Sequence, residues 1–198
     1  MLGEEGAAVA AVVRTEEEAG RLTLSNGGDG SVSAVDIADE DSVRACFDEI
    51  QDRYGRVDGL VHTVGMWERR PFVETPLEAW ESVLRVNLTT TFLCFREAVR
   101  VMDGRGTLIA FASRLGADGG TIGQAAYAAA KAGVIRLVES VDAEFEGVTA
   151  HAIAPSTILY GEGGEGVSAE ALVELTRDLL TGMSTASGGA VIRAYGAA

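Results

Sequence analysis

Gly106-Thr107-Leu108-Ile109-Ala110-Phe111-Ala112 is an apolar run of strand length, and it ends at Ser113. A short apolar run without alternation predicts a strand buried on both faces of a parallel sheet. On either side of this run, strand patterns alternate with amphipathic helical patterns along the chain. Such alternation predicts an α/β fold in which a doubly wound parallel sheet carries helices on both faces. Ser113, at the carboxyl end of its strand, then lies where open parallel sheets bind ligands.

The sequence predicts one domain over residues 1–198, because the length suits a single core and no linker or internal repeat interrupts the alternation. Strands are predicted at residues 7–13, 31–35, 57–61, 106–112, 148–153 and 190–194. Helices are predicted from residue 15, at 39–54, from 75 to about 102, around 127 to about 145, and at 168–180. Thr15 with Glu18, and Thr75 with Glu78, have the spacing of capping boxes, and Asp39 is a predicted N-cap.

Composition limits the classes of partner. One lysine and fifteen arginines stand against thirty acidic residues, and the formal net charge is −14. This argues against nucleic acid and anionic membranes, because both attract a basic face. Cys46 and Cys94 lack metal-like spacing, and they are predicted to be buried free thiols of a cytoplasmic protein. No cluster accompanies the two histidines, so no zinc site is expected. The acidic composition fits either a high-salt cytoplasm or a GC-rich source.

The one lysine, Lys131, follows Tyr127 by four positions in an alanine-rich segment that favours helix. Residues four apart share one helix face, so the phenol and the ammonium can converge. A tyrosine beside a cation can act as an acid or base near neutral pH. The competing interpretation is a surface lysine whose stem covers a core tyrosine.

Ser113, Tyr127 and Lys131, preceded by Asn87 in the long helical pattern, resemble the catalytic tetrad of the short-chain dehydrogenase/reductase family. The likeness covers nearly the whole chain in order. Two further segments match the family's Asn-Asn-Ala-Gly turn and its Pro-Gly-x-Ile segment: His62-Thr63-Val64-Gly65 and Ala154-Pro155-Ser156-Thr157-Ile158. The resemblance implies a Rossmann-like fold and an NAD(P)-dependent oxidoreductase that acts on a carbonyl or alcohol.

The resemblance also implies a role for each member of the tetrad. Tyr127 would exchange a proton with the substrate oxygen, and Ser113 would hold that oxygen in line. Lys131 would lower the pKa of Tyr127 and bind the nicotinamide ribose. Asn87 would anchor a water that connects Lys131 to solvent. Without the resemblance, Ser113 would be a solvated strand-end serine and Asn87 an amide that satisfies a helix kink.

The cofactor is predicted to be NADP, with NAD the weaker alternative. NAD-preferring relatives carry an acid at the position that ends the first strand predicted here, residues 7–13, whereas this chain has Val13 followed by Arg14. An arginine suits a 2′-phosphate, although a solvated surface arginine is the alternative. The remaining residues expected to contact the cofactor follow the family pattern: Asp36, Ile37, His62, Val64, Gly65, Lys131, Pro155, Ser156 and Ile158.

The chain departs from the family at its front. The family begins with a strand, a glycine-rich turn and a helix that bind the pyrophosphate. Here residues 1–6 resemble the end of that helix, and no Gly-x-x-x-Gly-x-Gly turn occurs. We therefore expect an N-terminally incomplete sheet that lacks a central strand between residues 7–13 and 57–61, and a natural protein that extends upstream of Met1. In the pattern after Ala154, Ser156 replaces a glycine and Tyr160 a threonine.

Two classes of function stay open: an oxidoreductase, and a cofactor-free remnant of the family that acts as a binding or scaffolding protein. Within the first, the tail faintly resembles dihydropteridine reductases at Val173, Glu174, Asp178, Thr181, Gly182, Ser187 and Gly188. The substrate is not specified. Trp67, Arg69 and Arg70 either line the mouth of the site or form an exposed loop, and residues 161–166 are expected to form a loop near it.

Assembly into a homodimer or homotetramer is predicted through the helices that carry Asn87 and Tyr127. Both helices have apolar residues on more than one side: Phe92, Leu93 and Phe95 in the first, and Val134, Ile135, Leu137 and Val138 in the second. One face of a sheet cannot cover two sides of a helix, so a partner is expected to bury the other.

Overall fold

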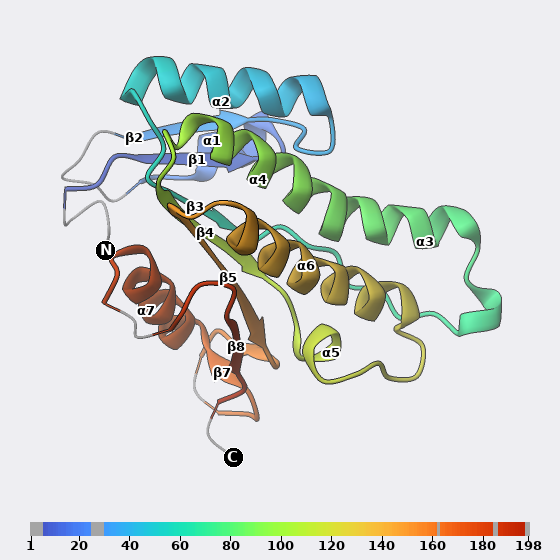
Figure 1. The fold of residues 1–198 in the computed structure, drawn as a ribbon. Coiled ribbons are helices and arrows are strands. Elements are labelled where there is room, and N and C mark those ends of the chain that lie inside the picture. The colour runs from blue at the N-terminus through green and yellow to red at the C-terminus, as the bar shows by residue number, and fades with distance from the viewer. Residues whose placement is uncertain (1–5, 25–29, 162, 184–185, 197–198) are drawn as a thin grey trace.

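The computed structural model describes residues 6–24, 30–161, 163–183 and 186–196 (Figure 1). All paired strands are parallel. The main sheet has the order β3-β4-β5-β8, and β1 and β2 form a separate pair. The strands are β1 (Val9–Val13), β2 (Gly30–Ala34), β3 (Gly59–His62), β4 (Gly106–Phe111), β5 (Val148–Pro155) and β8 (Val191–Ala194), with a short pair of β6 (Ile158–Leu159) and β7 (Val167–Ser168). The predicted Rossmann-like α/β fold is confirmed.

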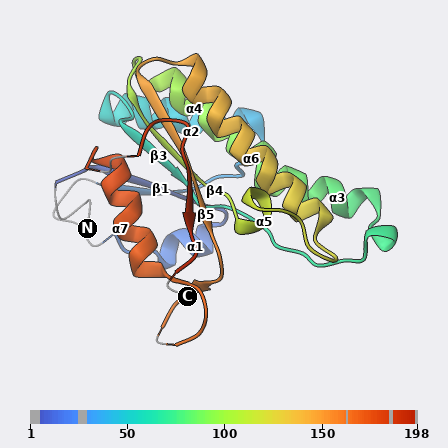
Figure 2. The ribbon, with the colours of Figure 1, turned by 60° about the horizontal axis from the view of Figure 1, so that its bottom comes forward.

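Helices cover both faces of the main sheet, as the views in Figures 1 and 2 show. Three long helices lie on one face: α2 (Glu40–Tyr54), α4 (Thr90–Val101) and α6 (Ala125–Glu144). On the other face lies α7 (Ala169–Leu180), while the short α1 (Glu16–Arg21) packs against the β1–β2 pair. None of the helices in the described residues is long and apolar enough to cross a membrane.

The apolar run of β4 supplies both cores. Leu108 and Ala110 are fully buried beneath α4 and α6, whereas the intervening Ile109 is fully buried in the cluster that contains α7. Successive side chains of a strand point to opposite faces, so a strand with a helical layer on each side must be apolar throughout. This packing explains why the run shows no alternation.

The long helix before β4 has three parts: α3 (Leu77–Leu84), a π-helical turn (Arg85–Thr89) and α4. The capping box predicted at its start is wrong, because Pro76 occupies the N-cap and the Thr75 hydroxyl donates instead to the Pro71 carbonyl at 2.9 Å. The predicted caps at Thr15 and Asp39 are confirmed by their hydrogen bonds to backbone amides. Two short helical segments were not predicted, a 3₁₀ turn (Phe72–Glu74) and α5 (Arg114–Ala117), and neither were the short strands β6 and β7.

The sheet is split where the sequence suggested that a central strand is absent. Among the described residues, β1 pairs only with β2 and β3 pairs only with β4, so one edge of each is unpaired. The parallel register of each pair is otherwise regular. Residues 1–5, which resemble a helix end, lie outside the described residues.

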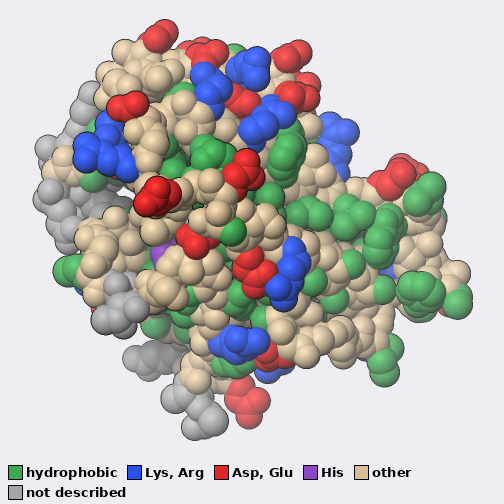
Figure 3. Space-filling view, viewed as in Figure 1, with side chains coloured by type: hydrophobic (Ala, Val, Ile, Leu, Met, Phe, Trp, Pro, Cys, Tyr) green, Lys and Arg blue, Asp and Glu red, His purple; other side chains and the backbone are tan. Residues whose placement is uncertain are grey.

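The expectation that α4 and α6 leave a second apolar side uncovered is wrong for most of the residues named. The chain itself buries Leu93, Phe95, Val134, Ile135 and Val138, while Leu137 is partly buried and Phe92 is 44% exposed. Other apolar side chains, Phe72, Val73 and Leu77, are exposed at the protruding end of α3, where green atoms gather in Figure 3. Assembly into a dimer or tetramer therefore stays a prediction.

Candidate active site

Asn87 ties the segment after β3 to the long helix. It lies in the π-helical turn and is fully buried. Its Nδ2 donates to the carbonyls of Val83 (2.9 Å) and Met66 (2.8 Å), and its Oδ1 accepts from the Met66 amide at 3.2 Å. A π-helical turn is rare and frequently marks a functional site. The amide does satisfy a helix irregularity, and the same bonds fix the backbone next to Gly65.

Ser113 and Tyr127 meet where α5 packs against α6. Ser113 is the N-cap of α5, and its Oγ accepts from the Leu115 amide at 3.3 Å. The Ser113 side chain lies close enough to the Tyr127 hydroxyl to act on its pKa. Their approach depends on Gly116, because a Cβ there would lie 2.5 Å from the Lys131 carbonyl carbon. The two hydroxyls are therefore positioned by a close contact between helix backbones.

Lys131 lies beneath the tyrosine with only 4% of its surface exposed. Its Nζ donates to the Phe111 carbonyl at 2.7 Å and lies 5.9 Å from the centre of the Tyr127 ring. Burial lowers the pKa of the ammonium to about 8. A Cβ at Gly65 would lie 2.8 Å from Asn87 Oδ1 and 3.1 Å from Lys131 Nζ. The four tetrad residues therefore converge on one place.

The pKa of Tyr127 differs from the expectation. Burial raises it above its usual value, and the nearby Ser113 side chain acts in the opposite direction. The predicted lowering by Lys131 is not found, because the ammonium faces the ring and donates to the Phe111 carbonyl. In this structure the tyrosine is thus held protonated, the state that donates a proton.

Most residues expected to contact a cofactor lie at the carboxyl ends of strands. Val64 and Gly65 are exposed after β3, and Ser156 and Ile158 follow β5 and are partly buried. Pro155, the last residue of β5, is buried.

At the end of β1, the Arg14 side chain is 82% exposed and lies 3.9 Å from the Glu18 carboxylate. Beyond β2, Asp36 is exposed, and its Oδ1 accepts from the Ala38 amide at 2.9 Å. The adjacent Ile37 packs against the core. Arg14 and Asp36 therefore present side chains to solvent at the same edge, and Ile37 does not.

His62 is the last residue of β3, but its side chain points into the core. It is 5% exposed, and its Nδ1 lies 3.3 Å from the Thr91 hydroxyl. Burial, aided by the charge of Lys131, lowers the pKa of His62 to about 4, so the imidazole is neutral near pH 7. Its side chain belongs to the core between β3 and α4. No group of three or more potential metal ligands occurs among the described residues.

Known proteins match the chain in sequence and in structure. The family model described as enoyl-(acyl carrier protein) reductase matches residues 1–191. A 3β-hydroxysteroid dehydrogenase from Mediterraneibacter gnavus is 34% identical over 77% of this chain and 58% of its own length. A 3-oxoacyl-[acyl-carrier-protein] reductase from Synechocystis is 34% identical over 68% of this chain and 56% of its own length. The chain thus spans less than two thirds of either relative.

A solved structure of a putative short-chain dehydrogenase/reductase from Burkholderia xenovorans is 27% identical, with a TM-score of 0.85. It covers 98% of this chain, and the match covers 85% of that protein. The chain belongs to the short-chain dehydrogenase/reductase family.

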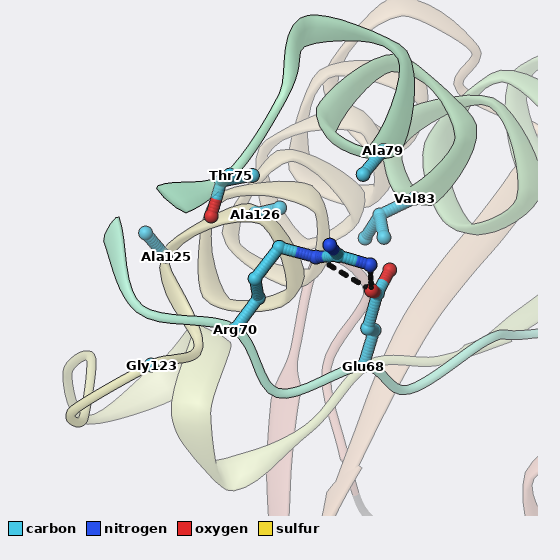
Figure 4. Close-up of a pocket in the computed structure, with 8 residues that line it drawn as sticks. All are labelled: Glu68, Arg70, Thr75, Ala79, Val83, Gly123, Ala125 and Ala126. Carbon is cyan, nitrogen blue, oxygen red and sulfur yellow. Dashed lines mark hydrogen bonds and ion pairs between the residues drawn. The ribbon is translucent and has the colours of Figure 1, made fainter. Parts of the chain in front are cut away.

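In this short-chain dehydrogenase/reductase, the loop after β3 is fastened to the start of α6. Trp67 Nε1 donates to the Gln124 side chain at 3.2 Å, and the Arg70 amide donates to the Gly123 carbonyl at 2.7 Å. An ion pair of Glu68 and Arg70 lies in a small pocket between this loop, α3 and α6 (Figure 4). Both suggestions for the loop hold in part, because it is exposed and contacts Gly123, which lies four residues before Tyr127.

A second cluster, which no sequence pattern predicted, lies beside the tetrad. Asp118, just after α5, accepts from Arg193 Nε at 2.9 Å and from the Tyr195 hydroxyl at 2.6 Å. These partners lie 75 and 77 residues away along the chain, so no local spacing links them. The Ser156 hydroxyl donates to the Tyr195 carbonyl at 2.9 Å. The cluster ties β8 to α5 and to the segment after β5.

Proposed function

We propose that this protein is an NAD(P)-dependent oxidoreductase that transfers a hydride between a nicotinamide cofactor and a carbonyl or alcohol substrate. The convergence of Ser113, Tyr127 and Lys131 is the observation that carries the proposal. Matched relatives named as dehydrogenases and reductases support it.

The chemistry assigned to the residues follows from their donors. The bound nicotinamide supplies the hydride in reduction and accepts it in oxidation. In reduction, the Tyr127 hydroxyl donates its proton to the developing alkoxide, and the Ser113 hydroxyl holds the carbonyl oxygen beside it. Lys131 has three donors, of which one is used by the Phe111 carbonyl. The other two are available for the ribose hydroxyls of the cofactor.

NADP is the proposed cofactor, with Arg14 as the group that binds the 2′-phosphate. Among the described residues, the exposed guanidinium has one long ion pair, with Glu18, so it can turn to a phosphate at little cost. Asp36, Ile37, Val64, Pro155, Ser156 and Ile158 are the proposed contacts elsewhere along the cofactor. His62 would act from the core by supporting the turn that precedes Gly65.

A titration and a turnover assay test the proposal. NADPH fluorescence is titrated with the chain, and a panel of carbonyl compounds is then tested for turnover. Tyr127→Phe is expected to retain NADPH binding and to lower kcat by about 10²–10⁴-fold, the usual effect of losing a positioned acid–base group.

Tyr54→Phe is the matched control, because that hydroxyl lies on α2 and contacts only Ser31. Near-normal turnover in Tyr127→Phe would contradict the mechanism. Absence of NADPH binding at millimolar concentration would favour the alternative class, a cofactor-free binding or scaffolding protein.

A further inference from the structure

Arg114 stands directly beside the proposed proton donor. It is the first residue of α5 and directly follows Ser113, whose side chain lies close enough to the Tyr127 hydroxyl to act on its pKa. Its side chain is exposed, whereas Ser113 is 9% exposed. A long cationic side chain therefore begins one residue from the hydroxyl that would hold the substrate oxygen.

The charge of Arg114 is not neutralised by an ion pair within the described residues. Its acidic neighbour is Asp118, whose two oxygens are occupied by Arg193 and Tyr195. The charge of Arg114 acts on Asp118 only at longer range. The group of Arg114, Arg193 and Asp118 thus carries one surplus positive charge. Such a surplus is unusual on a chain whose net charge is −14.

Tyr195 gives the guanidinium of Arg114 a fixed platform. The Arg114 Cζ lies 6.0 Å from the centre of the Tyr195 ring. Tyr195 is held at two points, because its hydroxyl donates to Asp118 and its backbone carbonyl accepts from Ser156. A guanidinium over an aromatic ring keeps its N–H groups in its plane available for a carboxylate. The platform follows β8, so it lies at the carboxyl edge that β8 shares with β4 and β5.

We infer that Arg114 binds an acidic group of the substrate, so that the preferred substrates are oxo acids or hydroxy acids in their anionic form. The inference rests on the proposed oxidoreductase function and narrows its substrate class. A guanidinium fork pairs with a carboxylate through two parallel hydrogen bonds, which a neutral ester cannot reproduce. Arg114 is thus a specificity-determining residue, while Ser113, Tyr127 and Lys131 perform the proton transfer.

Matched acids and esters test this inference. The probes are 3-oxobutanoate, 4-oxopentanoate and 5-oxohexanoate with their methyl esters, which place the carboxylate at increasing distance from the carbonyl. We expect at least one acid to exceed its ester about tenfold in kcat/KM. Arg114→Ala should lower this acid-to-ester ratio by about 10–100-fold, the scale of a charged hydrogen bond. Arg114→Lys should restore part of the ratio, because a point charge remains.

Arg136→Ala is the control, since it removes the same charge from an exposed position on α6 that pairs with Glu139. The inference would be overturned if the esters reached the same kcat/KM as the acids, or if Arg114→Ala left the acid-to-ester ratio unchanged. It would also be overturned if Arg136→Ala lowered that ratio as much as Arg114→Ala does. No turnover of any probe with NADPH or NADH would speak against the proposed function instead. In that case, calorimetry of the acids and esters with the protein tests the role of Arg114. The inference is supported if the acids bind and Arg114→Ala abolishes their binding. It is overturned if acids and esters bind equally or if neither binds.

Discussion

Lys131 is a buried ammonium without a carboxylate partner among the described residues, so burying its charge on folding costs free energy. Burial lowers its pKa from 10.5 to about 8. The unfolded chain consequently binds this proton more tightly between those two values, and the contribution of Lys131 to stability rises with pH across that window. Below about pH 8 the group is charged in both states and destabilises the fold.

We predict that the free energy of unfolding of the natural chain rises from pH 7.5 to 9.5 relative to that of Lys131→Met, by about 1–2 kcal/mol. Urea denaturation of both proteins at the two pH values measures the difference. The range stops at pH 9.5 because Tyr127, whose pKa is raised, acts in the opposite direction above its usual value. Parallel pH curves would mean that water reaches the ammonium.

Arg14 supplies a second prediction at this scale. If its guanidinium binds a 2′-phosphate, Arg14→Ala should weaken the binding of NADPH by about 1.5–3 kcal/mol and leave the binding of NADH nearly unchanged. Fluorescence titration with both cofactors measures the split. Arg21→Ala is the control, because this arginine is also exposed and pairs with a glutamate four residues away. An equal loss for both cofactors would indicate a structural role for Arg14.

The residues of the site differ in how far sequence predicts them. Tyr127 and Lys131 share one helix, so their spacing alone predicts that they are neighbours. Ser113 was predicted because a strand end is a local feature. The pairing of Arg193 with Asp118 was not predicted, because the two residues are 75 positions apart and only the fold brings them together. The pKa of Tyr127 was predicted with the wrong sign, because sequence does not give burial.

Among the elements, the contact of α5 with α6 has a strict steric requirement. A Cβ at Gly116 would meet backbone atoms, the Lys131 carbonyl carbon at 2.5 Å and the Ala132 nitrogen at 2.7 Å. We predict that Gly116→Ala separates the two helices, lowers stability by about 1–3 kcal/mol and reduces turnover by displacing Ser113 from Tyr127. Thermal unfolding and kcat measure the two effects.

Gly20→Ala is the matched control for this substitution. Gly20 lies within α1, and a Cβ there would have no neighbour within 4 Å. Alanine is the better helix former, so this change should stabilise the chain by about 0.5–1 kcal/mol and leave turnover unaltered. If both substitutions had the same effect, the packing of α5 on α6 would not be what positions the site.

The limits of sequence at the element scale have physical causes. Apolar periodicity predicted the six longer strands and the long helices, because burial imposes that pattern. It did not predict the π-helical turn, because one extra residue hardly changes the pattern, and the turn depends on the bonds of Asn87 to Val83 and Met66. The predicted cap at Thr75 was wrong because the Thr75 hydroxyl donates to the Pro71 carbonyl instead.

At the scale of the whole molecule, the proposed cofactor site spans two separate sheets. Arg14 and Asp36 belong to the β1–β2 pair, whereas Lys131 and Ser156 belong to the four-stranded side. An isolated two-stranded pair is marginally stable at best. Helix α2 links the pair to α4: its Tyr54 hydroxyl donates to Ser31 of β2 at 3.2 Å, and its Glu40 and Asp48 form ion pairs with α4 at 2.9 and 2.6 Å. The two halves of the site therefore rest on parts of unequal stability.

Amide hydrogen exchange measures this inequality. We predict that amides of β1 and β2 open at a lower free energy than those of β4, which is paired on both sides and fully buried at Leu108, Ile109 and Ala110. A cofactor that bridges the two sheets binds only when both are in place, so it stabilises the weaker one by mass action. Saturating NADPH should accordingly slow exchange in β1 and β2 more than in β4, and Arg14→Ala should remove most of that gain. Equal protection of all three strands before NADPH is added would show that the split sheet opens as one unit.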